Sequence, residues 1–271
     1  MREVNSDDRQ SALLSRMVRV QIEERGVRDP RLLEAFRRTP RARFVPEEFV
    51  DLAYADRPLP IGHHQTISQP YIVGLMLNNL NVKPEHRVLE IGTGSGWQTA
   101  VLAMLCREVY TVERIKPLLD RAWNAIMELD RRNVKFRYSD GSQGWPEHAP
   151  FDRIIFSAAP VEVPEKLLLE QLVEGGIAVL PVGDESAQLL VRIEKSAGKL
   201  RSKTLCAVRF VPLVSESIGP SAGGPQAPAE AKPPPQPGGK KEKEVTPTGF
   251  VGPPRRWQRT TGPVACSRTV R

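Results

Sequence analysis

Apolar residues in the middle of the chain form short strand-like runs that alternate with stretches of helical period. The strand patterns cover residues 87–91, 108–113, 134–139, 152–157 and 177–182, and helical patterns cover residues 97–105 and 116–130. This alternation predicts a doubly wound α/β fold with a mainly parallel sheet. Two further strand patterns, 188–194 and 204–212, follow without a helix between them, so antiparallel strands are expected at one edge.

The first 82 residues have a different pattern, which predicts short helices joined by loops. Residues 11–25 are amphipathic and end at a glycine, and residues 29–36 begin with an Asp-Pro helix start. Residues 57–70 hold prolines, a glycine and two histidines, which predicts a loop that leads into a helix over residues 71–80. We therefore divide the folded part into a helical N-terminal subregion, 1–82, and a core, 83–217.

The composition changes abruptly at about residue 218. Residues 218–271 are rich in proline, glycine, lysine and arginine, which predicts a disordered tail. This tail holds nine Lys or Arg against three Glu, and so carries +6 of the net charge of +7, while 30 basic and 29 acidic residues precede it. The tail is either a solubilising appendage or a weak polyanion-binding arm. The nearly neutral remainder argues against a specific nucleic-acid partner.

Other features of the 271-residue chain exclude several classes of protein. Cys106, Cys206 and Cys266 are isolated in the sequence, so we expect reduced thiols and no metal site. No run of 18 apolar residues occurs, and the N-terminus lacks a secretory signal, so we expect a cytoplasmic protein without a membrane anchor. Because no long heptad pattern is present, a monomer is expected.

The candidate ligand site is a glycine-rich turn within Val88-Leu-Glu-Ile-Gly-Thr-Gly-Ser-Gly-Trp97, where an apolar strand leads into a helix. Gly92, Gly94 and Gly96 permit positive φ and close approach of a ligand, and free amides at the helix start favour acceptor groups. A dinucleotide fingerprint would need a small residue where Trp97 stands, so the spacing favours S-adenosylmethionine over NAD. A tight turn between packed elements is the alternative.

Two acids end the next two strands of the pattern. Glu113 follows Gly96 by 17 residues, close to where an acid meets a ribose diol in such folds, although a solvated acid at the strand end or a helix cap is the alternative. Asp140, followed by Gly141, ends the third strand, where it is a candidate contact on the adenine side. A plain Asp-Gly turn is the alternative for this pair.

Further motifs make the chain resemble a known family over residues 11–213. They are Leu59-Pro-Ile-Gly62, Gln65-Thr-Ile-Ser-Gln-Pro-Tyr-Ile-Val73, Val109-Tyr-Thr-Val-Glu-Arg114, Ala149-Pro-Phe-Asp152, and Gly175-Gly176 through Pro181-Val-Gly183. With the glycine turn, they resemble the bacterial-type protein-L-isoaspartate O-methyltransferases. Thr-Ile-Ser-Gln-Pro is the family-specific segment, whereas methyltransferases share the glycine turn broadly. The resemblance implies a Rossmann-like fold and methyl esterification of the free carboxylate of L-isoaspartyl residues in damaged proteins, which begins their repair.

The resemblance also implies roles for particular residues. Ser68 matches the active-site serine. The resemblance and the strand-end positions together give the candidate cofactor-binding residues Thr66, Ile67, Gly92, Gly94, Gly96, Glu113, Asp140 and Gly141. The candidate substrate-binding residues are Ile61, His64, Gln65, Val211 and Pro212. The chain departs from the family at His64, Trp97 and Ser139, where glycine, tyrosine and glycine are usual.

The chemistry of the implied reaction fits the absence of a Ser/His/Asp arrangement. A carboxylate nucleophile, with an ordinary pKa of about 4, is already ionised at neutral pH and needs orientation rather than a base. Ser68 would then orient the carboxylate, although its position before an apolar helix alone favours a helix cap. The rival interpretations are a methyltransferase for another acceptor, an inactive binding module with a basic arm, and a nicotinamide oxidoreductase.

Overall fold

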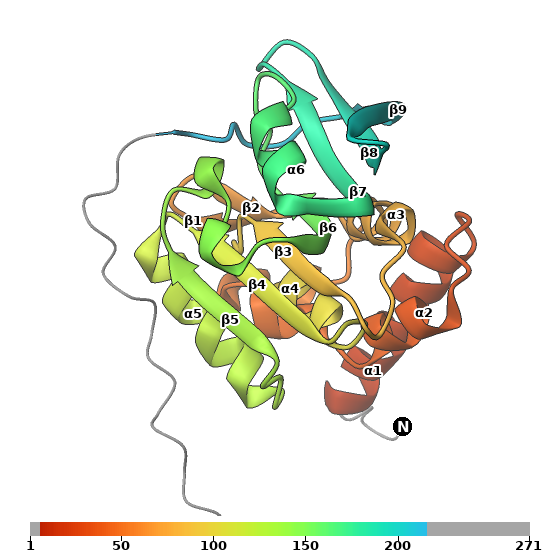
Figure 1. Ribbon diagram of the computed structural model, residues 1–271. Helices are drawn as coiled ribbons and strands as arrows, with labels where there is room; N and C mark the ends of the chain where they lie inside the picture. Colours follow the sequence, from red (N-terminus) through yellow and green to blue (C-terminus); the bar gives the residue numbers. More distant parts are fainter. Residues whose placement is uncertain (1–5, 216–271) are drawn as a thin grey trace, which may run out of the picture. The chain divides into compact units, whose positions relative to one another are not determined.

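A seven-stranded sheet forms the centre of the part of the chain that the structure describes, residues 6–215 (Figure 1). In this computed structural model the strand order is β5-β4-β3-β6-β7-β8-β9. The strands are β3 (Arg87–Ile91), β4 (Glu108–Glu113), β5 (Val134–Tyr138), β6 (Phe151–Phe156), β7 (Leu172–Gly183), β8 (Gln188–Ser196) and β9 (Lys199–Val208). The first five are parallel to one another and the last two pair antiparallel. The predicted mixed, Rossmann-like sheet is confirmed.

Helices cover both faces of this sheet. The helices are α1 (Ser6–Arg16), a π-helix (Met17–Glu23), α2 (Pro30–Arg37), α3 (Pro70–Leu80), α4 (Trp97–Ala103), α5 (Lys116–Glu128) and α6 (Glu165–Gln171). Short 3-10 turns occupy Arg41–Phe44, Glu47–Leu52, Gly141–Gln143 and Pro146–His148. Helices α3, α4 and α5 contact one face, and α6 contacts β7 on the other (Figure 1). Helix α2 packs against α3 and α4, so the N-terminal region adds a layer outside them.

The two faces of the sheet bury separate apolar clusters. On β3, Val88 belongs to the cluster shared with the N-terminal helices, whereas Leu89 and Ile91 belong to the cluster under α6. The same alternation holds on β6, where Ile155 faces the first cluster and Ile154 the second. Side chains of a strand point alternately to the two faces of the sheet. Because helices cover both faces, both sets of side chains are buried, and the strands are nearly continuously apolar.

The structure corrects two expectations about local structure. Residues 57–70 contain a hairpin, β1 (Leu59–Gly62) and β2 (Gln65–Ile67), where a loop is predicted. The last strand, expected over residues 204–212, is β9 at Lys199–Val208, because Ala197 and Gly198 both take positive φ and close a tight turn after β8. The expected tail, residues 218–271, lies outside the described residues. Within residues 6–215, no helix is long and apolar enough to cross a membrane.

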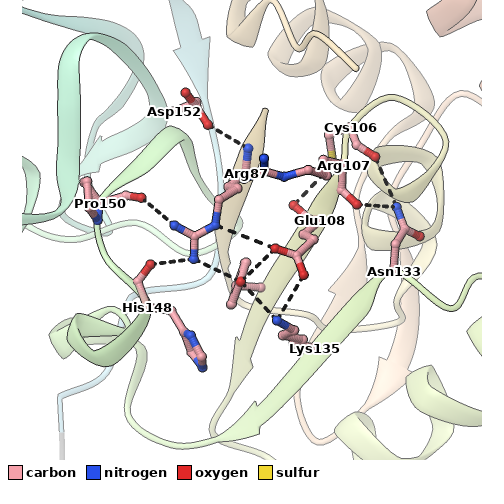
Figure 2. Close-up of polar contacts among 10 residues, drawn as sticks. Arg87, Cys106, Arg107, Glu108, Asn133, Lys135, His148, Pro150 and Asp152 are labelled. Carbon is pink, nitrogen blue, oxygen red and sulfur yellow. Dashed lines mark hydrogen bonds and ion pairs between the residues drawn. The ribbon is translucent and has the colours of Figure 1, made fainter. Parts of the chain in front are cut away.

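A polar network connects the amino ends of β3, β4 and β5 (Figure 2). The glycine turn lies at the opposite, carboxyl end of β3. The Tyr110 hydroxyl accepts hydrogen bonds from Arg87 Nη2 (3.0 Å) and Lys135 Nζ (3.2 Å), and it donates to Glu108 Oε2 (2.9 Å). Arg87 also donates to the carbonyl oxygen of His148 (2.8 Å). The hydrogen bond from Lys135 lowers the pKa of Glu108. One hydroxyl therefore connects three strands and uses its full hydrogen-bonding capacity.

Tyr110→Phe is expected to lower the free energy of unfolding by about 1–2 kcal/mol, because three hydrogen bonds are lost while the ring stays packed. Urea denaturation measures this change. Tyr138→Phe is the matched control, since the Tyr138 hydroxyl has no hydrogen-bond partner among residues 6–215. Equal stability of the two variants would show that the network contributes nothing.

Candidate active site

A pocket that is open to solvent lies at the carboxyl ends of the parallel strands. Its walls come from β2 and Ser68 after it, the glycine turn, the ends of β4 and β6, and the chain after β9. Ten of the residues predicted for the site line it: Gln65, Thr66, Ile67, Ser68, Gly92, Gly94, Glu113, Gly141, Val211 and Pro212. Segments far apart in sequence thus meet where open α/β sheets bind ligands.

The glycine turn after β3 has the backbone conformation that its sequence predicts. Gly92, Gly94 and Gly96 have φ values of 91°, 55° and 86°, a region that disfavours other residues. A Cβ on Gly94 would meet nothing closer than 3.8 Å, so its backbone is open to a ligand. A Cβ on Gly96 would lie 2.8 Å from the Ala122 Cβ. Gly96 does not line the pocket and instead allows α5 to pack closely.

Glu113 ends β4 and connects the glycine turn to the start of α5. Its Oε2 accepts a hydrogen bond from the Gly94 N–H (2.9 Å), and its Oε1 accepts from the N–H groups of Arg114 and Ile115 (both 2.9 Å). Burial raises the pKa of this carboxyl group, and the three amides oppose that shift. Because a carboxylate has about four acceptor positions, capacity remains for a hydroxyl of a ligand. No side chain caps α5, whose N-cap is Ile115, so the predicted helix-cap role of Glu113 has no hydrogen bond to support it, and these three bonds hold the turn before the helix.

Ser68 stands between β2 and α3 and forms part of the pocket wall. The N-cap of α3 is Gln69, and no side chain caps this helix. The Ser68 hydroxyl has no hydrogen-bond partner among residues 6–215. The hydroxyl is therefore available to a ligand in the pocket, whereas the helix-cap interpretation of this residue has no hydrogen bond to support it.

Three other predicted site residues lie outside the pocket walls. Asp140 accepts a hydrogen bond from the Ser142 N–H (2.8 Å) and so caps a 3-10 turn, the role of a plain Asp-Gly turn. Ile61 is 1% exposed, and its carbonyl oxygen accepts a hydrogen bond from Arg121. His64 is exposed at the tip of the β1–β2 hairpin. Gly141 therefore lines the pocket, whereas the preceding residue, Asp140, does not.

The tip of this hairpin has an unfavourable backbone conformation. His63 and His64 have φ values of 55° and 58°, in the left-handed region that suits glycine or asparagine. This geometry explains why the family usually has glycine where His64 stands. In this chain His63 and His64 form a two-residue hairpin connection, at a steric cost that glycine would not carry.

His64→Gly is expected to raise the free energy of unfolding by about 1 kcal/mol, because the left-handed conformation then carries no steric cost. Differential scanning calorimetry measures the rise in Tm. His64→Asn should give a smaller rise for the same reason. A fall in Tm for both variants would show that the imidazole stabilises the turn.

The structure also shows a buried acid below the pocket that sequence reasoning missed. Glu90 is 0% exposed and accepts hydrogen bonds from Gln98 Nε2 (2.9 Å), Thr99 Oγ1 (2.5 Å) and Thr111 Oγ1 (2.8 Å). Gln98 lines the pocket and also donates to Ser157 Oγ (3.0 Å). Burial raises the pKa of Glu90 to about 7. The signal in the sequence is an acid inside an otherwise apolar strand.

Residues 211–214 close the pocket from the side of β6. The Ala159 N–H donates to the Val211 carbonyl oxygen (2.8 Å), and the Leu213 N–H donates to the Ala159 carbonyl oxygen (2.7 Å). These two bonds form an isolated parallel bridge between Pro212 and Ala159, which attaches the last described segment to the chain after β6. Val211 and Pro212 thereby become part of the wall.

The pocket suits a nucleoside ligand better than a metal ion. Within residues 6–215, no group of three or more His, Cys, Asp or Glu is placed to hold a metal. The open backbone at Gly94 and the remaining acceptor capacity of Glu113 suit a ligand with hydroxyl groups. Fold and pocket together define the class of protein, a Rossmann-like methyltransferase.

Comparison with known proteins identifies the family within this class. The model of the protein-L-isoaspartate(D-aspartate) O-methyltransferase family matches residues 12–218. The protein-L-isoaspartate O-methyltransferase of Pectobacterium atrosepticum is 54% identical over 198 residues, 73% of this chain and 94% of that protein. That of Trichlorobacter lovleyi is 52% identical over 202 residues, 74% and 93% of the two chains. The chain belongs to the protein-L-isoaspartate O-methyltransferase family.

Solved structures agree with this assignment. One described as a protein-L-isoaspartate O-methyltransferase has a TM-score of 0.68 at 26% identity, with 76% of this chain and 66% of that chain covered. A putative family member from Plasmodium falciparum, in complex with S-adenosyl-L-homocysteine, has a TM-score of 0.64 at 27% identity. That match covers 76% of this chain and 98% of the other.

Proposed function

We propose that this protein transfers a methyl group to the free carboxylate of L-isoaspartyl residues in damaged peptides and proteins, and so begins their repair. The observation that carries the proposal is the Ser68 hydroxyl, which forms part of the pocket wall in the family-specific Thr-Ile-Ser-Gln-Pro segment and has no partner among residues 6–215. Family membership supports the same reaction.

The cofactor is S-adenosylmethionine, which supplies a methyl group on a sulfonium cation when bound. Gly92 and Gly94 would admit it to the backbone of the turn, and Glu113 would accept a ribose hydroxyl. Thr66, Ile67 and Gly141 would complete the cofactor walls, and Gly96 and Asp140 would act by shaping the adjoining turns.

The chain's own residues bind and orient the acceptor. The Ser68 hydroxyl would donate a hydrogen bond to the isoaspartyl carboxylate, which needs no base because it is ionised at neutral pH. Gln65, Val211 and Pro212 would contact the peptide at the pocket, and Ile61 and His64 would shape the hairpin beside it. Within this proposal the protein works as a cytoplasmic monomer without a specific nucleic-acid partner.

Transfer of labelled methyl to two synthetic peptides, identical except for L-isoaspartate or ordinary aspartate, tests the function. We expect transfer to the isoaspartyl peptide alone, and Ser68→Ala should lower kcat at least about tenfold through loss of a hydrogen bond to a charged group. Cofactor affinity of Ser68→Ala should stay close to that of the wild type. Cofactor binding without transfer to either peptide would contradict the repair function and favour another acceptor.

A further inference from the structure

Arg41 is a buried cation directly behind the segment that carries Ser68. Its side chain is 0% exposed. The guanidinium donates to the carbonyl oxygens of Ser68 (3.0 Å) and Ile67 (3.5 Å), and also to those of Arg57 (3.1 Å) and Ala53. One side chain thus joins the pocket segment to two points of the N-terminal region.

The charge of Arg41 is balanced mainly by these backbone dipoles. It forms no ion pair among residues 6–215, and Asp56, the nearby acid that acts on it, is paired with Arg25 at 2.8 Å. Burial lowers the pKa of Arg41 to about 10, so the group stays charged at neutral pH. A charge without an ionic partner is costly to bury, and here its hydrogen bonds all go to the backbone carbonyl oxygens that it contacts.

The direction of these hydrogen bonds decides what the segment presents on its other side. In a planar trans peptide the C=O and the next N–H point in opposite directions. Because Arg41 binds the carbonyl oxygens of Ile67 and Ser68, the N–H groups of Ser68 and Gln69 point away from it. Neither N–H has a hydrogen-bond partner among residues 6–215. Ile67 and Ser68 line the pocket, whereas Arg41 does not.

A second wall of the pocket also contacts Arg41. The guanidinium lies over the ring of Trp97, 5.4 Å from its centroid, and the Trp97 indole N–H donates to the Thr39 carbonyl oxygen (3.0 Å). Trp97 begins α4 after the glycine turn and lines the pocket. Arg41 therefore fixes the Ser68 segment relative to the helix that follows the glycine turn.

We infer that Arg41 is a positioning residue for methyl transfer, which holds the Ile67 and Ser68 carbonyls away from the pocket so that donors face the acceptor carboxylate. Carbonyl oxygens would repel an anionic acceptor, and N–H and O–H groups attract it. The inference rests on the proposed function, because the acceptor is taken to be a carboxylate. No atom of Arg41 touches the reacting groups.

Two variants of Arg41 separate its charge from its shape. Arg41→Lys keeps the charge but loses the planar fork that reaches several carbonyl groups, and Arg41→Ala leaves space for a guanidinium ion. Leu33→Ala is the matched control, since Leu33 is buried in the same N-terminal region but makes none of these contacts. All variants are assayed as full-length protein, well below their unfolding temperatures.

We expect kcat for the isoaspartyl peptide to fall about 10-fold in Arg41→Lys and about 100-fold in Arg41→Ala, because displaced donors no longer match the acceptor. The Kd of S-adenosylhomocysteine should change less than about twofold, since the glycine turn and Glu113 remain. Millimolar guanidinium chloride should restore part of the kcat of Arg41→Ala, and sodium chloride at equal ionic strength should not. Leu33→Ala should keep the wild-type kcat.

Unchanged kcat in both Arg41 variants, or an equal loss in Leu33→Ala, would overturn the inference. Hydrogen exchange gives a test that does not depend on the reaction or on Arg41→Ala folding. Arg41→Lys should speed amide exchange at Ile67, which pairs with Leu59, and at Val73, whose N–H donates to the Gln69 carbonyl oxygen, and leave residues 87–96 as in the wild type. If the wild type methylates neither peptide, the proposed function fails, while the exchange result still decides whether Arg41 holds the segment.

Discussion

Replacing Glu113 with alanine is expected to weaken binding of S-adenosylhomocysteine about 100-fold or more. The carboxylate accepts hydrogen bonds from the Gly94, Arg114 and Ile115 N–H groups and would also accept a ribose hydroxyl. Each hydrogen bond to a charged group contributes roughly 1.5–3 kcal/mol, so loss of the ligand contact and of the turn's support gives this magnitude. Isothermal titration calorimetry measures the Kd directly.

Glu174→Ala is the control for this experiment. Glu174, in β7, also accepts hydrogen bonds from backbone N–H groups, those of Ala197 and Gly198 in the turn between β8 and β9. Its loss should leave the Kd within about twofold of the wild type, because it does not line the pocket. Wild-type affinity in Glu113→Ala would mean that Glu113 only holds the adjoining turns through the Gly94, Arg114 and Ile115 N–H groups.

The unfolding free energy of the wild type is expected to fall by up to about 3 kcal/mol as the pH rises from about 4.5 to about 7, because of Glu90 alone. Burial raises the pKa of Glu90 from 4.5 to about 7, so the folded state binds the proton more tightly than the unfolded state. The folded state is therefore favoured at low pH, and this contribution is lost as Glu90 ionises. The effect of Glu90 levels off about one pH unit above its folded-state pKa, where the carboxyl group is fully ionised in both states.

Glu90→Gln isolates this contribution, because glutamine does not titrate. Urea denaturation across this pH range should give a smaller decline for Glu90→Gln than for the wild type. Glu113, whose pKa burial also raises, acts in the same direction in both proteins. Glu174→Gln should keep the wild-type decline. The same decline in Glu90→Gln and the wild type would show that Glu90 is ionised throughout this range.

The parallel half of the fold could be predicted because its pattern is local. Strands β3, β4 and β6 contain short apolar runs and β5 alternates apolar and basic residues, each next to a turn, and the expected strand at residues 87–91 matches β3. Helix α6 was not anticipated, since its seven residues follow a proline-rich segment and carry only two buried leucines. The sequence does not predict the β1–β2 hairpin, because a two-residue hairpin turn is usually recognised by glycine or asparagine, and His63 and His64 occupy these positions here.

The sequence predicts those site residues whose role follows from their own backbone conformation or from their position at the end of a strand. The glycine turn and Glu113 follow from the order of strand, turn and acid. Glu90 and Arg41 could not be found in this way, because their partners are separated from them in sequence and only folding brings them together. A buried charge in a helical N-terminal segment looks, in sequence, like any exposed arginine.

The attachment of residues 211–214 to Ala159 has a consequence for how the protein is made. The last strand, β9, ends at Val208, so all seven strands of the sheet are complete before this wall of the pocket is synthesised. Synthesis that stopped just after β9 would therefore give a chain with every strand of the sheet but without one side of the binding pocket. The ability to hold cofactor and peptide together depends on a short segment beyond the last strand.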